Sequence, residues 1–198
     1  MMILPKFTDP NPSVEWLRKE QDRLHSQADK MIATTHIMDV FAKYGKLSAI
    51  GGSYQYGLMI YPDLNIGLVA DIVTKKCFAM LVAGLASNPQ VRGIQTADTI
   101  NFNLSRHPRP KGYWVGLDIP SEGDRWGIDC WFQQPDWVES QEDEYTERLS
   151  VIDQAARDAI LAIKYNLIFK GEYGKKYLSY DVYDAILDRG VRSLQDFK

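Results

Sequence analysis

The sequence predicts an α/β (α+β) fold, a mixed sheet flanked by helices and followed by a C-terminal helical extension. Polar and apolar residues alternate in the middle of the chain, whereas apolar residues recur every three or four positions near both ends. We expect residues 1–135 to form the α/β domain and residues 136–198 to form the helical extension packed on it. With 198 residues, 45% of them hydrophobic and 25% charged, the chain is long and apolar enough to bury a core.

The first third of the chain predicts helix and then strand. Ser13 is a good N-cap for a helix that runs to about Tyr44, with a break near residues 34–35. A short apolar segment at residues 47–50 follows and leads into a glycine pair. Over residues 63–68, leucine and isoleucine alternate with aspartate, asparagine and glycine, which predicts a strand with one buried face.

The middle of the chain predicts one helix and further strands. Helical spacing of apolar residues indicates a helix over residues 74–86, ended by Asn-Pro. Residues 91–105 are typical of one or two strands. Residues 113–119 and 126–132, joined by a polar turn, predict a β-hairpin.

The C-terminal part is expected to be helical from Ser140. A stripe of apolar residues at spacings of three or four predicts an amphipathic helix that ends at Gly171. A second helix is expected from about Ser179 to Gly190. The stripe consists of Leu149, Ile152, Ala156, Ala159, Ile163 and Leu167.

Charge and cysteine content limit the partners. Lys and Arg number 23 and Asp and Glu 26, so the net charge of −3 gives no bulk attraction for nucleic acid or an anionic membrane. No apolar stretch approaches the roughly 18–20 residues that span a bilayer, and the apolar run at residues 1–4 is too short for a signal peptide. Cys77 and Cys130 are expected to be buried free thiols. These features together predict a cytoplasmic protein.

A glycine turn and three polar strand residues suggest chemistry. Residues 51–53, Gly-Gly-Ser, allow a ligand close to the backbone, where amides and a hydroxyl can hold phosphate oxygens. Asp63 and Asn65 alternate on a strand and so share a face, where their oxygens can hold a divalent ion. Asp129 faces away from the core and joins them if its strand is a neighbour. Taken singly, these features are equally typical of a turn, a strand start and a solvent-facing strand position.

In this order, the Gly-Ser turn, the strand pair and the later lone aspartate resemble the nucleotidyltransferase fold, over about residues 34–132. That superfamily resembles the polymerase-beta palm and includes antibiotic nucleotidyltransferases and small toxin-neutralising members. The resemblance implies that Asp63, Asn65 and Asp129 bind Mg²⁺, or Mn²⁺ in its place. It also implies that Asp63 and Asp129 are catalytic, with Asp129 helping to activate the acceptor hydroxyl.

The phosphate-binding residues are less well marked in the sequence. The resemblance places Gly52 and Ser53 at the phosphates of a nucleoside triphosphate (NTP). Lys164, at the edge of the C-terminal apolar stripe, can bury its stem and turn its ammonium toward the cleft. The basic loop holding Arg106, Arg109 and Lys111 either reaches phosphates or is a solvated surface. Tyr54 and Tyr56 either stack on a base or sugar or pack in the core.

One residue departs from the family pattern, because Asn65 stands where a second aspartate is expected. Loss of one negative charge predicts weaker metal binding. The first hypothesis is therefore an enzyme that transfers a nucleoside monophosphate from an NTP to an unknown small-molecule or protein acceptor. The alternative is an inactive module of the same fold that binds nucleotide or, like an antitoxin, another protein.

Overall fold

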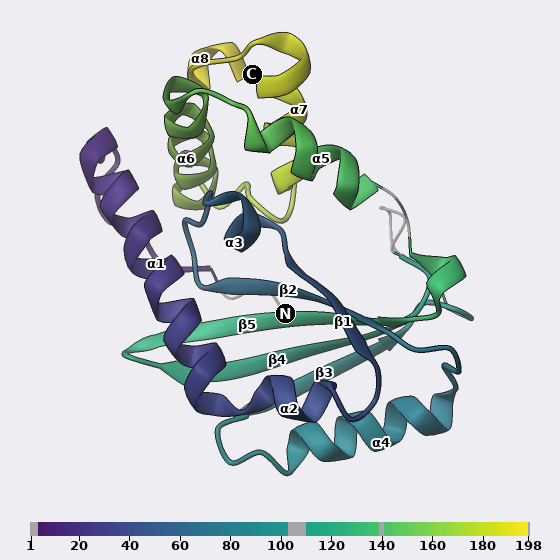
Figure 1. Ribbon diagram of the computed structural model, residues 1–198. Coiled ribbons are helices and arrows are strands. Elements are labelled where there is room, and N and C mark those ends of the chain that lie inside the picture. Colours follow the sequence, from purple (N-terminus) through teal and green to yellow (C-terminus); the bar gives the residue numbers. More distant parts are fainter. Residues whose placement is uncertain (1–3, 103–109, 139–140, 198) are drawn as a thin grey trace.

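The protein is described by a computed structural model covering residues 4–102, 110–138 and 141–197. Arg106 and Arg109 of the basic loop lie outside these residues. The chain forms a five-stranded mixed sheet in the order β1-β2-β5-β4-β3 (Figure 1). Parallel pairing occurs between β2 and β5, and the other neighbours are antiparallel. The strands are β1 (Lys46–Gly51), β2 (Asp63–Val69), β3 (Gly93–Asp98), β4 (Tyr113–Ser121) and β5 (Asp124–Gln133).

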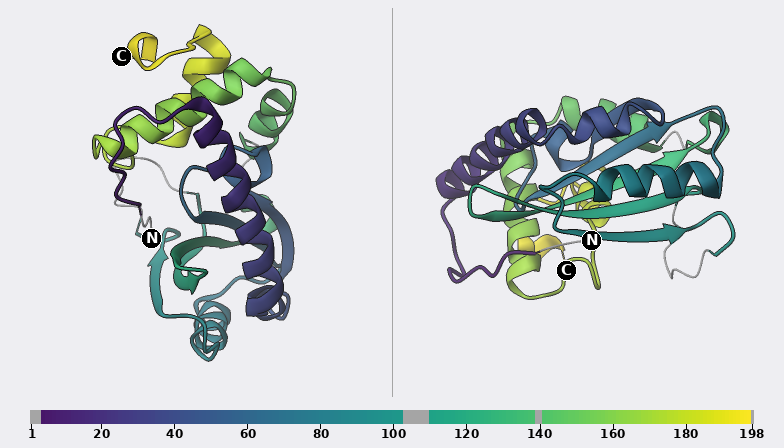
Figure 2. Two further views of the ribbon diagram at one scale, coloured as in Figure 1. Left: turned by 90° about the vertical axis from the view of Figure 1, so that its left-hand side faces the viewer. Right: turned by 90° about the horizontal axis from the view of Figure 1, so that it is seen from below.

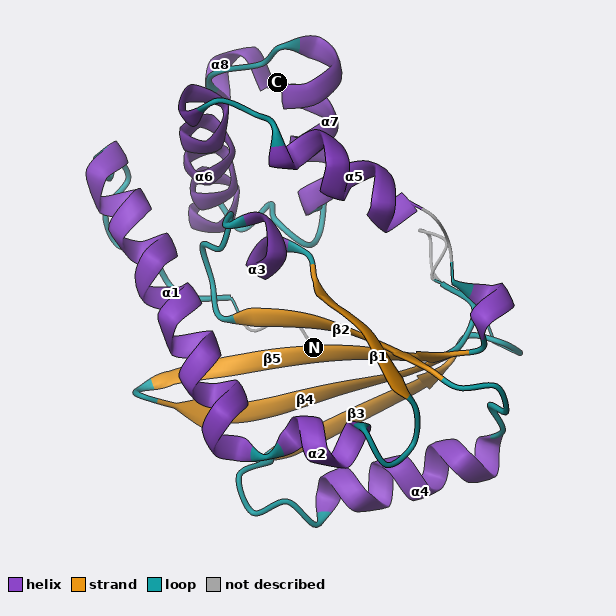
Figure 3. Cartoon of the chain, viewed as in Figure 1, coloured by secondary structure: helices purple, strands orange, loops and turns teal. Residues whose placement is uncertain are grey.

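Three helices cover one face of the sheet, as Figure 3 shows. They are α1 (Val14–Thr35), α2 (Ile37–Phe41) and α4 (Lys75–Ala86). Their apolar side chains pack with Leu64, Ile128 and Cys130 of the central strands, all 0% exposed, into one hydrophobic cluster. The mixed α/β fold predicted from the sequence is confirmed.

The C-terminal helices gather at one end of the sheet (Figure 1). They form a second hydrophobic cluster, which also takes in Leu17 of α1 and the apolar segment before β2 that contains Leu58 and Ile60. The boundary expected after residue 135 stays a prediction. The helices are α5 (Gln141–Ser150), α6 (Gln154–Phe169), α7 (Ser179–Arg189) and α8 (Leu194–Phe197).

The local signals in the sequence mostly act as expected. The Ser13 hydroxyl accepts a hydrogen bond from the amide of Trp16, and the first helix breaks at His36, which adopts a left-handed conformation with φ 52°. The C-terminal apolar stripe, however, belongs to two helices. The carboxylate of Asp153 accepts a hydrogen bond from the amide of Ala156 at 2.7 Å, so a new helix starts at Gln154.

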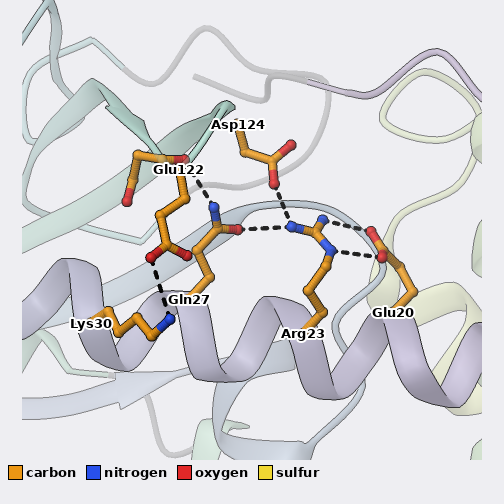
Figure 4. A network of polar contacts seen from close by, with 7 residues as sticks. Glu20, Arg23, Gln27, Lys30, Glu122 and Asp124 are labelled. Atoms are coloured by element: carbon orange, nitrogen blue, oxygen red, sulfur yellow. Dashed lines mark hydrogen bonds and ion pairs between the residues drawn. The ribbon is translucent and has the colours of Figure 1, made fainter.

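Helix α1 connects the two hydrophobic clusters, and the left view of Figure 2 shows it running from the C-terminal helices along the sheet. Arg18 pairs with Asp158 of α6 through two hydrogen bonds of 2.8 and 2.6 Å. Further along, Gln27 donates to the carbonyl of Ser121 at 2.8 Å and accepts from Arg23 at 3.1 Å (Figure 4). Polar contacts therefore fix α1 on both α6 and the β4–β5 hairpin. No helix among the described residues is long and apolar enough to cross a membrane.

The Gln27 contact predicts a measurable stability effect. Gln27 is only 2% exposed, so Gln27→Ala removes a largely buried hydrogen bond to the Ser121 carbonyl, and we expect a loss of about 1–2 kcal/mol in the free energy of unfolding. Urea denaturation followed by tryptophan fluorescence measures it. Lys30→Ala is the matched control, since Lys30 pairs with Glu122 of the same hairpin on the exposed side of α1 and should stay close to the parent. Equal losses in the two variants would contradict the prediction.

Candidate functional site

Pairing of β2 with β5 brings the three predicted polar residues together. Asn65 lies directly opposite Asp129 in the parallel register, and Asp63 is two residues earlier on β2. Their side chains point away from the face on which Leu64 and Ile128 are buried. The placement expected for Asp63, Asn65 and Asp129, on one face of neighbouring strands, is what the structure has.

These residues line a pocket of about 360 Å³ between the sheet and the C-terminal helices. Residues 51–53, the Gly-Gly-Ser turn, form another part of its lining. The helical side contributes Tyr173, Ser179, Tyr180 and Tyr183. A pocket of this size, with convergent polar groups and perturbed titration, is typical of a small-molecule site.

Gly52 allows the turn to approach β2 closely. The turn leads from β1 into the short helix α3 (Ser53–Tyr56), with Gly52 at φ 68° and ψ −146°, a conformation that residues with a side chain rarely adopt. A Cβ at Gly52 would lie 2.9 Å from Nδ2 of Asn65. The backbone of the turn and the amide of Asn65 are therefore in direct proximity at the pocket wall.

The charge at Asp63 is poorly stabilised. Burial, together with the negative charge of Asp129, raises the pKa of Asp63 to about 7, whereas the charge of Lys164 acts in the opposite direction. Asn65 Nδ2 donates to Asp63 at a long 3.4 Å. The positive charge of Lys164 and the long hydrogen bond from Asn65 therefore offset only part of the effect of burial on Asp63.

The donor set fits a divalent cation. Asp63 and Asp129 offer carboxylate oxygens and Asn65 an amide oxygen, the hard ligands that Mg²⁺ and Mn²⁺ bind. The described residues contain no cluster of three His, Cys, Asp or Glu side chains that could hold a metal ion, and Asn65 is of none of these types. A bound cation would offset both the burial of the Asp63 charge and its repulsion by Asp129, which together raise the pKa of Asp63.

The sequence predicted that the ammonium of Lys164 turns toward the cleft, but in the structure the ammonium is buried beside Ser53. Its side chain is 0% exposed, and its ammonium donates to Ser53 Oγ at 2.7 Å and to the carbonyl of Leu58 at 2.8 Å. The amphipathic stripe correctly indicated a buried stem, but the ammonium is buried too. Lys164 reaches the pocket through Ser53.

The sequence did not indicate that tyrosines of the C-terminal helices line the pocket. Tyr180 and Tyr183 follow one another at i, i+3 on α7 and line the pocket, a spacing that could have indicated their shared face. The two tyrosines beside the turn have different surroundings. Tyr56 lines the pocket, whereas the hydroxyl of Tyr54 donates to Asp29 and its ring stacks on His25 of α1.

No protein-family model matches the chain, and no curated protein matches it in sequence. Several solved structures, however, resemble the chain in fold. One chain of the poly(A) polymerase complex GLD-2–GLD-3 has a TM-score of 0.61 at 12% identity over 91% of this chain and 60% of that one. A GLD-2/RNP-8 complex gives a TM-score of 0.54 at 16% identity over 88% and 61%. Cid1, described with RNA terminal uridylyl transferase activity, gives 0.56 at 12% identity over 88% and 51%.

The chain therefore shares the fold of these structures, and it spans between 51% and 61% of their chains. The mixed sheet with flanking helices that the sequence predicted belongs to this fold. At this level of identity the likeness concerns the fold.

The raised pKa of Asp63 predicts how stability depends on pH. Between its ordinary pKa of 3.8 and its folded pKa of about 7, the folded protein keeps a proton that the unfolded chain has released. The contribution of Asp63 therefore stabilises the fold below pH 3.8 and is lost as the pH rises to about 7. Without divalent ions, we expect the stability of the parent relative to Asp63→Asn to fall by about 1–3 kcal/mol over this range. A difference that stays constant with pH in urea denaturation would contradict this.

Replacement of Asn65 tests the metal site that the sequence predicts. Asn65→Asp adds a unit charge beside Asp63 and Asp129, so we expect Mn²⁺ to bind about five- to thirtyfold more tightly in titration calorimetry. The same charge repels Asp63 when no metal is present, so the metal-free variant should unfold at lower urea than the parent at neutral pH. Asn11→Asp, which adds an equal charge at an exposed residue outside the pocket lining, is the control. Unchanged affinity and stability in Asn65→Asp would show that this strand binds no metal.

Proposed function

We propose that this protein is a Mg²⁺-dependent nucleotidyltransferase that moves a nucleoside monophosphate from an NTP to an acceptor hydroxyl. The observation that carries the proposal is the convergence of Asp63, Asn65 and Asp129 on one sheet face, beside residues 51–53, in one pocket. The shared fold with poly(A) polymerase and uridylyl transferase structures supports it.

In the proposed mechanism, the chain binds and orients the NTP between turn and sheet. The Ser53 hydroxyl and the close backbone at Gly52 bind phosphate oxygens, and Asp63, Asn65 and Asp129 hold the cation. When bound, Mg²⁺ (or Mn²⁺) supplies charge stabilisation for the phosphate oxygens. Tyr180, 51% exposed, presents a ring on which the base can stack.

In the proposed transfer step, Asp129 acts as the general base. The acceptor oxygen forms a bond with the α-phosphorus, the bond to the pyrophosphate oxygen breaks, and the acceptor proton passes to the carboxylate of Asp129. Asp63 and Asp129 are the catalytic residues of this proposal. Small molecules and proteins are proposed acceptors, and the names of the structural neighbours add RNA 3′ ends to the set to be tested. We place the reaction in the cytoplasm.

Transfer of label from [α-³²P]NTPs tests the proposal directly. With Mg²⁺ or Mn²⁺, the parent should label one acceptor from a panel of small hydroxyl compounds, proteins and RNA oligonucleotides. Asp129→Asn should lower the rate at least about a hundredfold, whereas Asp71→Asn, at an exposed aspartate outside the pocket lining, should keep it. An Asp129→Asn protein as active as the parent would contradict the mechanism.

Asn65 favours a second candidate, a module that binds nucleotide or a protein partner without transfer. Calorimetry with the four NTPs and Mg²⁺ separates these outcomes. Binding without transfer of label would indicate a nucleotide-binding module, and absence of binding would favour the protein-interaction module.

A further inference from the structure

Lys164 lies in a buried polar network beneath the pocket. The side chain is 0% exposed, on a face of α6 packed among apolar residues. Its ammonium donates to Ser53 Oγ at 2.7 Å and to the carbonyl of Leu58 at 2.8 Å. Both acceptors belong to the segment that joins the Gly-Gly-Ser turn to β2, so this one cation fixes the segment at two points.

The surroundings of the ammonium are otherwise aromatic. It lies 6.0 Å from the ring centroid of Tyr61 and 5.8 Å from that of Tyr183. Burial lowers the pKa of Lys164, and nearby Tyr173 and Asp63 oppose that effect. The group is therefore costly to bury and is retained by specific polar contacts.

The hydrogen-bond chemistry of an ammonium determines which way Ser53 can act. An ammonium has donors only, so Ser53 Oγ must accept from Lys164. The hydroxyl then has its own proton to donate, toward Tyr183 at 3.3 Å or toward an anion in the pocket. Lys164 thus occupies an acceptor site of Ser53 Oγ, and the hydroxyl of Ser53, which lines the pocket, keeps its proton to donate there.

We propose that Lys164 is a positioning residue that acts through Ser53: it orients the hydroxyl to donate to an NTP phosphate and does not itself contact the phosphate. This inference rests on the proposed function, since it requires an NTP in the pocket. It differs from the expectation drawn from the sequence, in which the ammonium faces the cleft.

Arg157 provides a matched control on the same helix. It lies seven residues before Lys164 and donates from Nη1 to the carbonyl of Tyr56 at 2.7 Å and from Nη2 to that of Leu149 at 3.3 Å. It therefore also ties α6 to the segment beside the pocket, but its hydrogen bonds go to carbonyls and not to Ser53. Arg157→Met measures the cost of losing such a tie alone.

A double-mutant cycle on NTP affinity tests the inference. Titration calorimetry with each of the four NTPs and Mg²⁺ is carried out on the parent, Ser53→Ala, Lys164→Met and the double variant. We expect each single variant to bind about tenfold more weakly. The double variant should bind within about twofold of Ser53→Ala, because in this proposal Lys164 makes no contact of its own with the NTP. Arg157→Met should stay within about twofold of the parent.

Lys164→Gln separates positioning from charge and serves if Lys164→Met does not fold. Its side-chain amide keeps an N–H donor for Ser53 without the charge. When Ser53 is retained, we therefore expect Lys164→Gln to bind NTP within about threefold of the parent. A contact between ammonium and phosphate predicts instead a loss in Lys164→Gln that persists after Ser53→Ala.

The outcomes distinguish failure of the proposed function from failure of the positioning role of Lys164. A parent that binds none of the NTPs overturns the proposed function, and the role of Lys164 with it. A parent that binds, with losses that add in the Ser53→Ala/Lys164→Met protein, overturns only the positioning role.

Discussion

Parallel pairing of β2 with β5 is the constraint on which the candidate site depends. Parallel neighbours require a crossover, and here residues 70–123 supply it with α4, β3 and β4 before the chain returns beside β2. The register is fixed from the opposite face, where Ile66 and Cys130 are opposite one another and almost completely buried. A slip by one residue would turn Asp129 into that core, so the packing of the apolar face determines the geometry of the polar face.

The polar face balances two opposing requirements. Carboxylates close enough to share a cation repel one another when it is absent. Burial is the main cause of the raised pKa of Asp63, and the negative charge of Asp129 adds to it. Asn65 lessens this repulsion, because its amide carries no charge and its Nδ2 donates to Asp63. An amide at this position also offers a cation less charge than a carboxylate would. At position 65, an amide therefore favours stability of the metal-free protein, whereas a carboxylate would favour affinity for metal.

Local signals in the sequence were sufficient for the elements but not for all of the site. Ser13 caps the first helix where expected, and the alternation around Leu64 indicated both the strand and the outward side of Asp63 and Asn65. Asp129 lies beside Asn65 because β2 pairs with β5. The sequence indicated this long-range pairing only through the family resemblance. The position of Lys164 could not be derived, because an apolar stripe does not show whether a cation at its edge meets solvent or a buried hydroxyl such as that of Ser53.

The central claim is that the face shared by β2 and β5 binds a divalent cation together with an NTP. Anomalous diffraction from crystals grown with Mn²⁺ and a non-hydrolysable NTP analogue tests it most directly. The account predicts an anomalous peak within coordination distance of the carboxylates of Asp63 and Asp129, with analogue phosphates near Ser53. Analogue bound elsewhere, or a pocket without an anomalous peak beside Asp63 and Asp129, would contradict it.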